Sequence, residues 1–196
     1  MLYSTEVSRG SLLPLESKRI ASLLISNPSA SEWKQAIEKE NILQKETVTT
    51  ARRQANLIRK RLEQLDLAGW NLIREGGLEV TTQTLLAAAM KHSKLLEDFV
   101  QHVYIARQKQ MDSHLRLTDW EDFINECAIR EPAVEGWNKS TNAKVFNMVT
   151  QILVDAKYLV DRDTMRISPR SLHPDVKRYL AQRGDLQIIN CLERLA

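Results

Sequence analysis

An apolar stripe with helical spacing in the first third of the chain constrains the fold more than any other feature. Six residues step along it by three or four positions: Val48, Ala51, Ala55, Ile58, Leu62 and Leu65. This spacing places them on one face of an amphipathic helix. The same periodicity predicts one long helix over residues 79–110. Only 6 glycines and 5 prolines occur in 196 residues, which argues against a large all-β fold. The sequence therefore predicts a mostly α-helical fold.

The helical pattern is interrupted near the acidic loop 130–136. We expect a helical domain over 1–136, which starts with a helix-turn-helix-like unit, and a smaller winged-helix-like domain over 137–196. In the second part, the periodicity changes at 158–167 and predicts a short β-hairpin with a polar tip. The expected fold is thus a multi-helix bundle that carries these two units. The sequence leaves open whether the two parts pack as one body.

Charge is distributed unevenly along the chain. The net charge is only +3, so the distribution matters more than the total. Residues 45–61 contain six basic side chains and one acid, Glu46, whereas residues 112–135 contain seven acids and two arginines. The molecule is therefore expected to have a basic region and an acidic region.

The basic region coincides with the third helix of the helix-turn-helix-like unit. In such units, the N-terminal turns of the last helix enter the major groove, and flanking basic residues contact phosphates. The candidate DNA-binding residues here are Lys45, Thr49, Thr50, Arg52, Arg53, Asn56, Arg59 and Lys60. The alternative is that these residues form the solvated face of an amphipathic helix, and the pattern alone does not decide between the two.

The winged-helix-like part contributes a second set of candidates. Its first helix would present Lys139, Ser140, Asn142 and Lys144, and the hairpin tip would present Arg162 to a phosphate or to the minor groove. The alternative is a hairpin that only caps the core, because Asp161 and Asp163 beside the tip would repel phosphate.

The sequence contains no pattern that is typical of catalysis. The two cysteines and four histidines lack metal-ligand spacing, and there is no glycine-rich phosphate loop. Within 91–94, neighbouring helical residues point about 100° apart, so His92 and Ser93 are not expected to form a catalytic dyad. We expect no metal, no cofactor and no enzymatic activity.

The expected location is the cytoplasm. The two cysteines, Cys127 and Cys191, are isolated, which suits a reducing compartment. The longest apolar run, 85–90, is far shorter than the roughly 20 residues of a membrane span. The first residues also lack the pattern of a signal peptide.

Several segments, in order, resemble one protein family. They are Gly10–Ser17, Glu32-Trp33, Asn41–Lys45, Thr50–Ala55, Ile58–Leu62, Leu86–Phe99 and Ala156–Leu159 with the residues that follow it. The chain resembles the BrxA family of BREX phage-resistance systems over nearly its whole length, and the stretch 86–99 is the most distinctive. The resemblance supplies no list of contact residues.

The resemblance implies a helical protein without known catalytic activity that binds double-stranded DNA. It also implies partners of the same system: a methyltransferase, an ATPase and a phosphatase-like protein. Binding is expected to be driven mainly by phosphate contacts, with weak sequence specificity. Two alternatives remain at this point, a protein–protein adaptor that uses the acidic segment 112–135 and an RNA-binding helical module.

Overall fold

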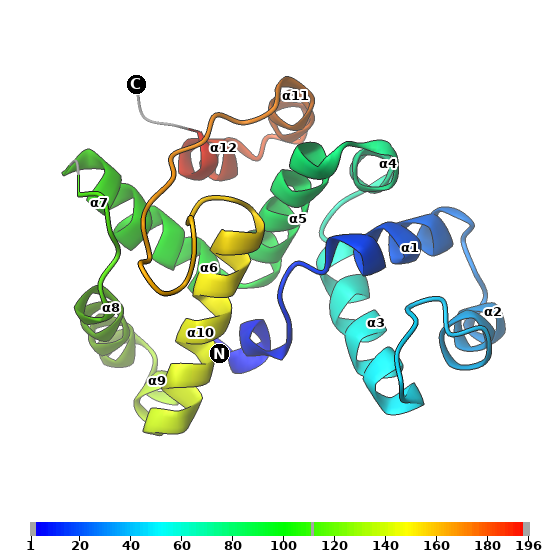
Figure 1. Ribbon diagram of the computed structural model, residues 1–196, viewed down its shortest axis with the longest axis horizontal. Helices are drawn as coiled ribbons and strands as arrows, with labels where there is room; N and C mark the ends of the chain where they lie inside the picture. Colours follow the sequence, from blue (N-terminus) through cyan, green and yellow to red (C-terminus); the bar gives the residue numbers. More distant parts are fainter. Residues whose placement is uncertain (1–2, 111, 194–196) are drawn as a thin grey trace.

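The computed structural model describes residues 3–110 and 112–193, and within these ranges the chain is mostly helical and contains no strand (Figure 1). The first half contains η1 (Thr5–Arg9), α1 (Pro14–Ile25), α2 (Ala30–Lys34), η2 (Gln35–Lys39), α3 (Val48–Leu62), α4 (Leu67–Glu75) and α5 (Leu78–His92). The second half contains α6 (Lys94–Phe99), η3 (Val100–Tyr104), α7 (Ile105–Lys109), α8 (Leu117–Arg130), α9 (Pro132–Glu135), α10 (Lys139–Asp155), α11 (Pro174–Gln182) and α12 (Leu186–Leu192). The predicted helical class is confirmed.

Helix α5 is the central element. Every residue from Val80 to Met90 is buried, which is typical of a helix that has neighbours on all sides. Helices α1, α3 and α4 pack against it, and α10 and α11 contact it as well. Figure 1 shows α5 between the N-terminal helices and the C-terminal ones. The core is therefore built around this helix.

The predicted single helix over 79–110 is wrong, because the chain breaks at Ser93. Ser93 ends α5 in an extended conformation, with φ −125°. Its Oγ accepts a hydrogen bond from the backbone N of Leu96 at 3.3 Å and caps α6. A serine side chain that bonds to the backbone competes with helix continuation. The chain then passes through a π-helical turn, η3, before α7.

Replacing Ser93 with alanine is expected to destabilise the fold by about 1 kcal/mol, because the cap of α6 is lost. Urea denaturation of the two proteins measures the difference. Ser140→Ala is the matched control, since Ser140 is an exposed residue in the first turn of α10. Its effect should stay within about 0.5 kcal/mol. Equal losses for the two variants would contradict the capping role.

The apolar stripe of α3 faces the core as predicted, with two differences. Ala51, Ala55, Ile58 and Leu62 are buried, and Leu65 is buried too, although it lies beyond the end of the helix. Val48 is 45% exposed, because it is the first residue of the helix and lies beyond the contact with its neighbours. The second difference is a buried arginine on the same helix.

Arg61 was counted with the basic residues of this region, yet it is 4% exposed. Its guanidinium donates hydrogen bonds to the carbonyl oxygens of Ser11 at 2.5 Å and Gly10 at 2.7 Å. Burial lowers the pKa of Arg61 to about 10, so the side chain remains protonated at neutral pH. Arg61 therefore fastens the N-terminal segment to α3.

The predicted helix-turn-helix-like unit is not confirmed. The connection between η2 and α3 runs over residues 40–47, which is longer than the three- to four-residue turn of that motif. The Asn41 side chain holds this connection, since it donates to the Lys45 carbonyl at 2.8 Å and accepts from the Lys45 backbone N at 2.9 Å. A structured loop thus replaces the short turn.

The predicted β-hairpin and winged helix are not confirmed either. The chain does reverse over 161–164, where Asp161 Oδ1 accepts hydrogen bonds from the backbone N of Asp163 and Thr164. However, the two arms meet only in an isolated bridge between Leu159 and Ile167. Met165 has φ 50°, and this left-handed conformation prevents a regular strand.

Contacts cross the boundary between 1–136 and 137–196. Element η1 packs against α10, and the backbone N of Leu12 donates to Asp155 Oδ2 at 3.1 Å. The Tyr104 hydroxyl donates to the Tyr158 carbonyl at 2.8 Å. The division into two domains stays a prediction, and these contacts set the positions of the surfaces described next.

Candidate nucleic-acid interface

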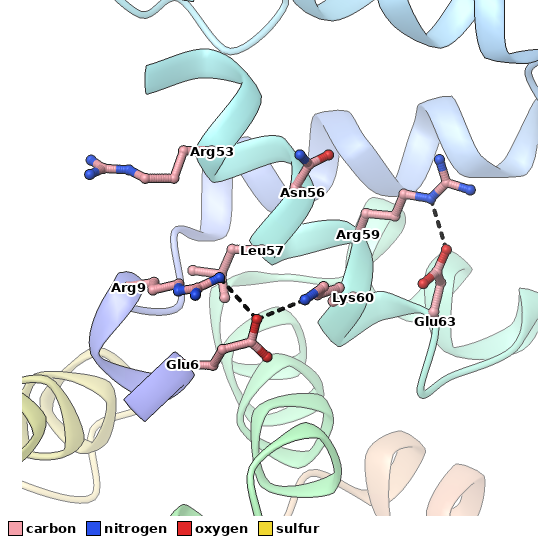
Figure 2. A pocket seen from close by; sticks show the side chains of 8 residues that line it. All are labelled: Glu6, Arg9, Arg53, Asn56, Leu57, Arg59, Lys60 and Glu63. Atoms are coloured by element: carbon pink, nitrogen blue, oxygen red, sulfur yellow. Dashed lines mark hydrogen bonds and ion pairs between the residues drawn. The ribbon is translucent and has the colours of Figure 1, made fainter. Parts of the chain in front are cut away.

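A hollow of about 410 Å³ lies between the exposed side of α3 and η1. Helical spacing places Arg53, Asn56 and Lys60 on one side of α3. Figure 2 shows the side chains that line the hollow, which are Glu6, Arg9, Arg53, Asn56, Leu57, Arg59, Lys60 and Glu63. The hollow therefore brings together four of the predicted residues of α3 and two residues of η1 that the sequence analysis did not identify.

Three cations of α3 are paired with carboxylates. Arg52 Nε and Nη2 donate to the two carboxylate oxygens of Glu38 at 2.6 and 2.8 Å. Arg59 Nε donates to Glu63 at 2.8 Å. Both arginines are exposed, at 56% for Arg52 and 46% for Arg59, and ion pairs that water reaches are weak. A phosphate can therefore compete for these arginines.

Arg59 makes a further contact, because its guanidinium lies over the ring of Trp33, 4.8 Å from the ring centroid. The third pair joins Lys60 to Glu6, with 2.7 Å from Nζ to Oε1. The stacking holds Arg59 against α2, while the ion pair holds Lys60 against η1.

Arg53 and Asn56 are the unpaired polar residues of this face. Both are exposed, and neither side chain forms a hydrogen bond or ion pair within 3–110 or 112–193. Figure 2 shows Arg53 extending away from the ion-paired group around Glu6. Arg53 is therefore the cation of α3 that is most available to an outside anion.

Three predicted residues near the start of α3 lie outside the hollow. Thr49 is exposed. Thr50 donates its backbone N–H to Thr47 Oγ1 at 3.2 Å, which caps the helix. Lys45 lies half-buried in an ion pair with Glu16 at 2.6 Å, so it is turned toward α1 rather than toward a groove-binding surface.

The second predicted set lies on α10 and on the segment that follows it. Lys139, Ser140 and Lys144 are exposed. Asn142 instead accepts a hydrogen bond from Trp120 Nε1 at 2.6 Å, so it positions a core tryptophan. Arg162 at the turn donates to Asn147 Oδ1 at 3.0 Å, which holds the turn against α10.

Three further cations in this region were missed by the sequence analysis. Lys157, Arg166 and Arg170 are exposed and follow α10 closely in the chain. Together with three predicted residues they complete the C-terminal cation group, defined here as Lys139, Lys144, Lys157, Arg162, Arg166 and Arg170. None of these six side chains forms an ion pair with the part of the chain that the structure describes. In the sequence, these cations stand out as an excess of bases: the 32 residues 139–170 contain six bases and three acids.

The two predicted sets do not form one site. Figure 1 shows α3 on one side of the molecule and the N-terminal end of α10 on another. Element η1 packs against α10 and is linked to α3 by the Glu6–Lys60 ion pair. The cations of α3 and those of 139–170 thus lie on different elements, which η1 links.

The segment 91–94 connects elements rather than forming a dyad. Lys91 pairs with Asp185 before α12 at 2.5 Å, and Lys94 pairs with Asp98 at 2.9 Å. His92 Nε2 lies 3.4 Å from Glu6 Oε2. Within the described ranges, no three histidine, cysteine or acidic side chains are grouped as metal ligands. No helix of these ranges combines the length and apolarity needed to cross a membrane.

Comparisons with known proteins agree over almost the whole chain. A family model described as BrxA matches residues 1–184. The BREX protein BrxA of Paramagnetospirillum magneticum is 34% identical over 191 residues, which is 97% of this chain and 96% of that protein. The BREX protein BrxA of Escherichia coli is 32% identical over 184 residues, which is 94% of this chain and 86% of that protein.

A solved structure gives the same result for the fold. The crystal structure of an uncharacterized protein from Magnetospirillum magneticum matches with a TM-score of 0.89 and 34% sequence identity. The match covers 98% of this chain and 99% of that one. Sequence and fold lead to the same conclusion: the chain belongs to the BrxA family of BREX proteins.

Proposed function

We propose that this protein is a non-enzymatic accessory component of a BREX defence system that binds double-stranded DNA in the cytoplasm. The observation that supports this most is the C-terminal cation group, whose six exposed side chains have no ion pair in the described structure. Exposed cations that form no ion pair within the protein are typical of a surface that binds a polyanionic partner. The other BREX components, a methyltransferase, an ATPase and a phosphatase-like protein, are its expected protein partners.

Contacts to phosphate account for such a surface better than contacts to bases. Lysine and arginine neutralise phosphates without reading sequence. Asn142, which was a candidate for base contact, is occupied by Trp120, and Arg162 is already held by Asn147. The proposed binding is therefore mainly electrostatic and weakly sequence-specific, and the hollow beside α3 supplies a second contact through Arg53.

The test is a gel-shift series with duplex DNA at increasing salt. Binding through four to six phosphates gives a slope of log K against log salt of about −4 to −5. Duplexes of unrelated sequence should bind with similar affinity. An affinity that does not change between low and physiological salt would contradict the proposal. Competition by single strands or structured RNA that exceeds competition by duplex would favour the RNA-binding alternative.

One observation favours the adaptor as a second candidate. Glu121 and Asp122 on α8 are exposed and form no ion pair with the described residues, and Ile129 on the same helix is 86% exposed. An acidic helix whose carboxylates lack internal partners suits a basic protein partner. If duplex binding fails in the salt series, this surface becomes the leading candidate for the protein's role in the system.

A further inference from the structure

Three nitrogen groups from three elements converge on the carboxylate of Glu6. Arg9 Nη1 of η1 and Lys60 Nζ of α3 both donate to the same oxygen, Oε1, at 3.0 and 2.7 Å. His92 Nε2 of α5 lies 3.4 Å from the other oxygen. Figure 2 shows Arg9 and Lys60 approaching Glu6 at the edge of the hollow. This is the arrangement that a bound anion would have, with a side chain of the protein in its place.

The charges of the groups fit this description. The hydrogen bond from Lys60 is the largest effect that lowers the pKa of Glu6, so the carboxylate is ionised at neutral pH. Burial lowers the pKa of His92, and its imidazole is therefore neutral at neutral pH. Two cations, Arg9 and Lys60, thus face one internal anion, while Arg53 lies on the same hollow without one.

We propose that this hollow is a phosphate-binding site and that Glu6 is its internal occupant, which competes with the DNA backbone for Arg9 and Lys60. The inference rests on the proposed function for the source of the phosphate. Phosphate would first meet Arg53 and Asn56, and it would gain Arg9 and Lys60 only as Glu6 moves aside. Glu6 therefore limits the contribution of this surface to binding.

Phosphate can compete with Glu6 because the ion pairs of Glu6 with Arg9 and Lys60 are accessible to solvent. The side chains of Glu6, Arg9 and Lys60 are 25%, 57% and 50% exposed. Ion pairs with this degree of exposure are weak, since water and salt screen them. A phosphate that brings additional hydrogen-bond acceptors can therefore replace the carboxylate without disrupting the core.

The test compares Glu6→Gln with the wild-type protein in duplex binding, measured by fluorescence anisotropy at about 0.1 M salt. Glutamine keeps the shape and removes the charge. Release of one lysine or arginine to phosphate is expected to raise the affinity by about eightfold, which is one contact at a slope of 0.9. Glu126→Gln is the matched control, because it removes the same charge and releases Arg130 on α8.

The outcomes are separable. The inference is supported if Glu6→Gln binds more tightly than Glu126→Gln and if the gain disappears when Arg9 and Lys60 are also changed to alanine. It is overturned if the two glutamine variants bind equally, if Glu6→Gln binds more weakly, or if the gain persists without Arg9 and Lys60. Melting temperatures of all variants verify that η1 remains folded.

A second probe separates this inference from the proposed function. Inorganic pyrophosphate is added to the wild-type protein and to Glu6→Gln, and the rise in melting temperature is measured. A larger rise for Glu6→Gln without any duplex binding would support the phosphate site and contradict the proposed function. Salt-dependent duplex binding with no difference between the two proteins by either probe would support the proposed function and contradict the phosphate site.

Discussion

Reversing the charges of Arg162, Arg166 and Arg170 together is expected to lower the affinity for duplex DNA by about 500-fold at about 0.1 M salt. The estimate follows from counterion release, since each lost phosphate contact costs about eightfold under this condition. The slope of log K against log salt should also become shallower by about 3. The triple glutamate variant and the wild-type protein are compared by anisotropy over a range of salt concentrations.

A matched variant distinguishes a contact surface from a general effect of charge. Reversal of Arg74, Lys177 and Arg178 changes the net charge equally, but these cations pair with acids on α4 and around α11 and α12. Affinity should fall far less in this variant. If both variants lose affinity equally, the C-terminal cation group is not the contact surface. Circular dichroism verifies that both remain helical, because Arg166 also takes part in an isolated bridge.

Replacing Arg61 with alanine is expected to destabilise the fold by about 3 kcal/mol, because two carbonyl oxygens lose charged hydrogen-bond donors. Arg61 is 4% exposed and binds the carbonyls of Gly10 and Ser11, so the surrounding groups cannot easily be rehydrated. For a chain of this size, the melting temperature should fall by about 10 °C. Urea denaturation and a thermal melt measure the two quantities.

Arg53→Ala is the control for this prediction. It makes the same truncation on the same helix, but Arg53 is exposed and has no partner in the described structure. Its effect on stability should stay within about 0.5 kcal/mol, although it should weaken binding of DNA. A small loss for Arg61→Ala would show that the N-terminal segment is held to α3 by other contacts.

The sequence predicts burial correctly where the spacing of residues within one helix determines which side chains face the core. The stripe of α3 predicted that Ala51, Ala55, Ile58 and Leu62 are buried, and they are. The sequence does not predict the burial of a side chain whose hydrogen-bond partner comes from a distant segment. Arg61 is buried because two carbonyls of the N-terminal segment accept its hydrogen bonds, and no local pattern indicates this.

The same limit applies to the candidate site. Glu6 and Arg9 reach the hollow from η1, and the one local feature that relates them is a three-residue spacing. Which cations of α3 remain unpaired depends on Glu38, Glu63 and Glu6, and two of these come from other elements. Residue type thus predicted a basic surface, but tertiary contacts decide which of its charges are available.

The packing of η1 against α10 has a consequence for the protein while it is being made. Leu12 and Asp155 are 143 residues apart in the chain, so the N-terminal segment reaches its final position only after α10 has left the ribosome. Chains fold from the N-terminus as they emerge, and contacts between distant segments form late. During synthesis, Arg61 can therefore hold the carbonyls of Gly10 and Ser11 as soon as α3 has emerged, whereas the packing of η1 against α10 is completed only when the C-terminal part is made.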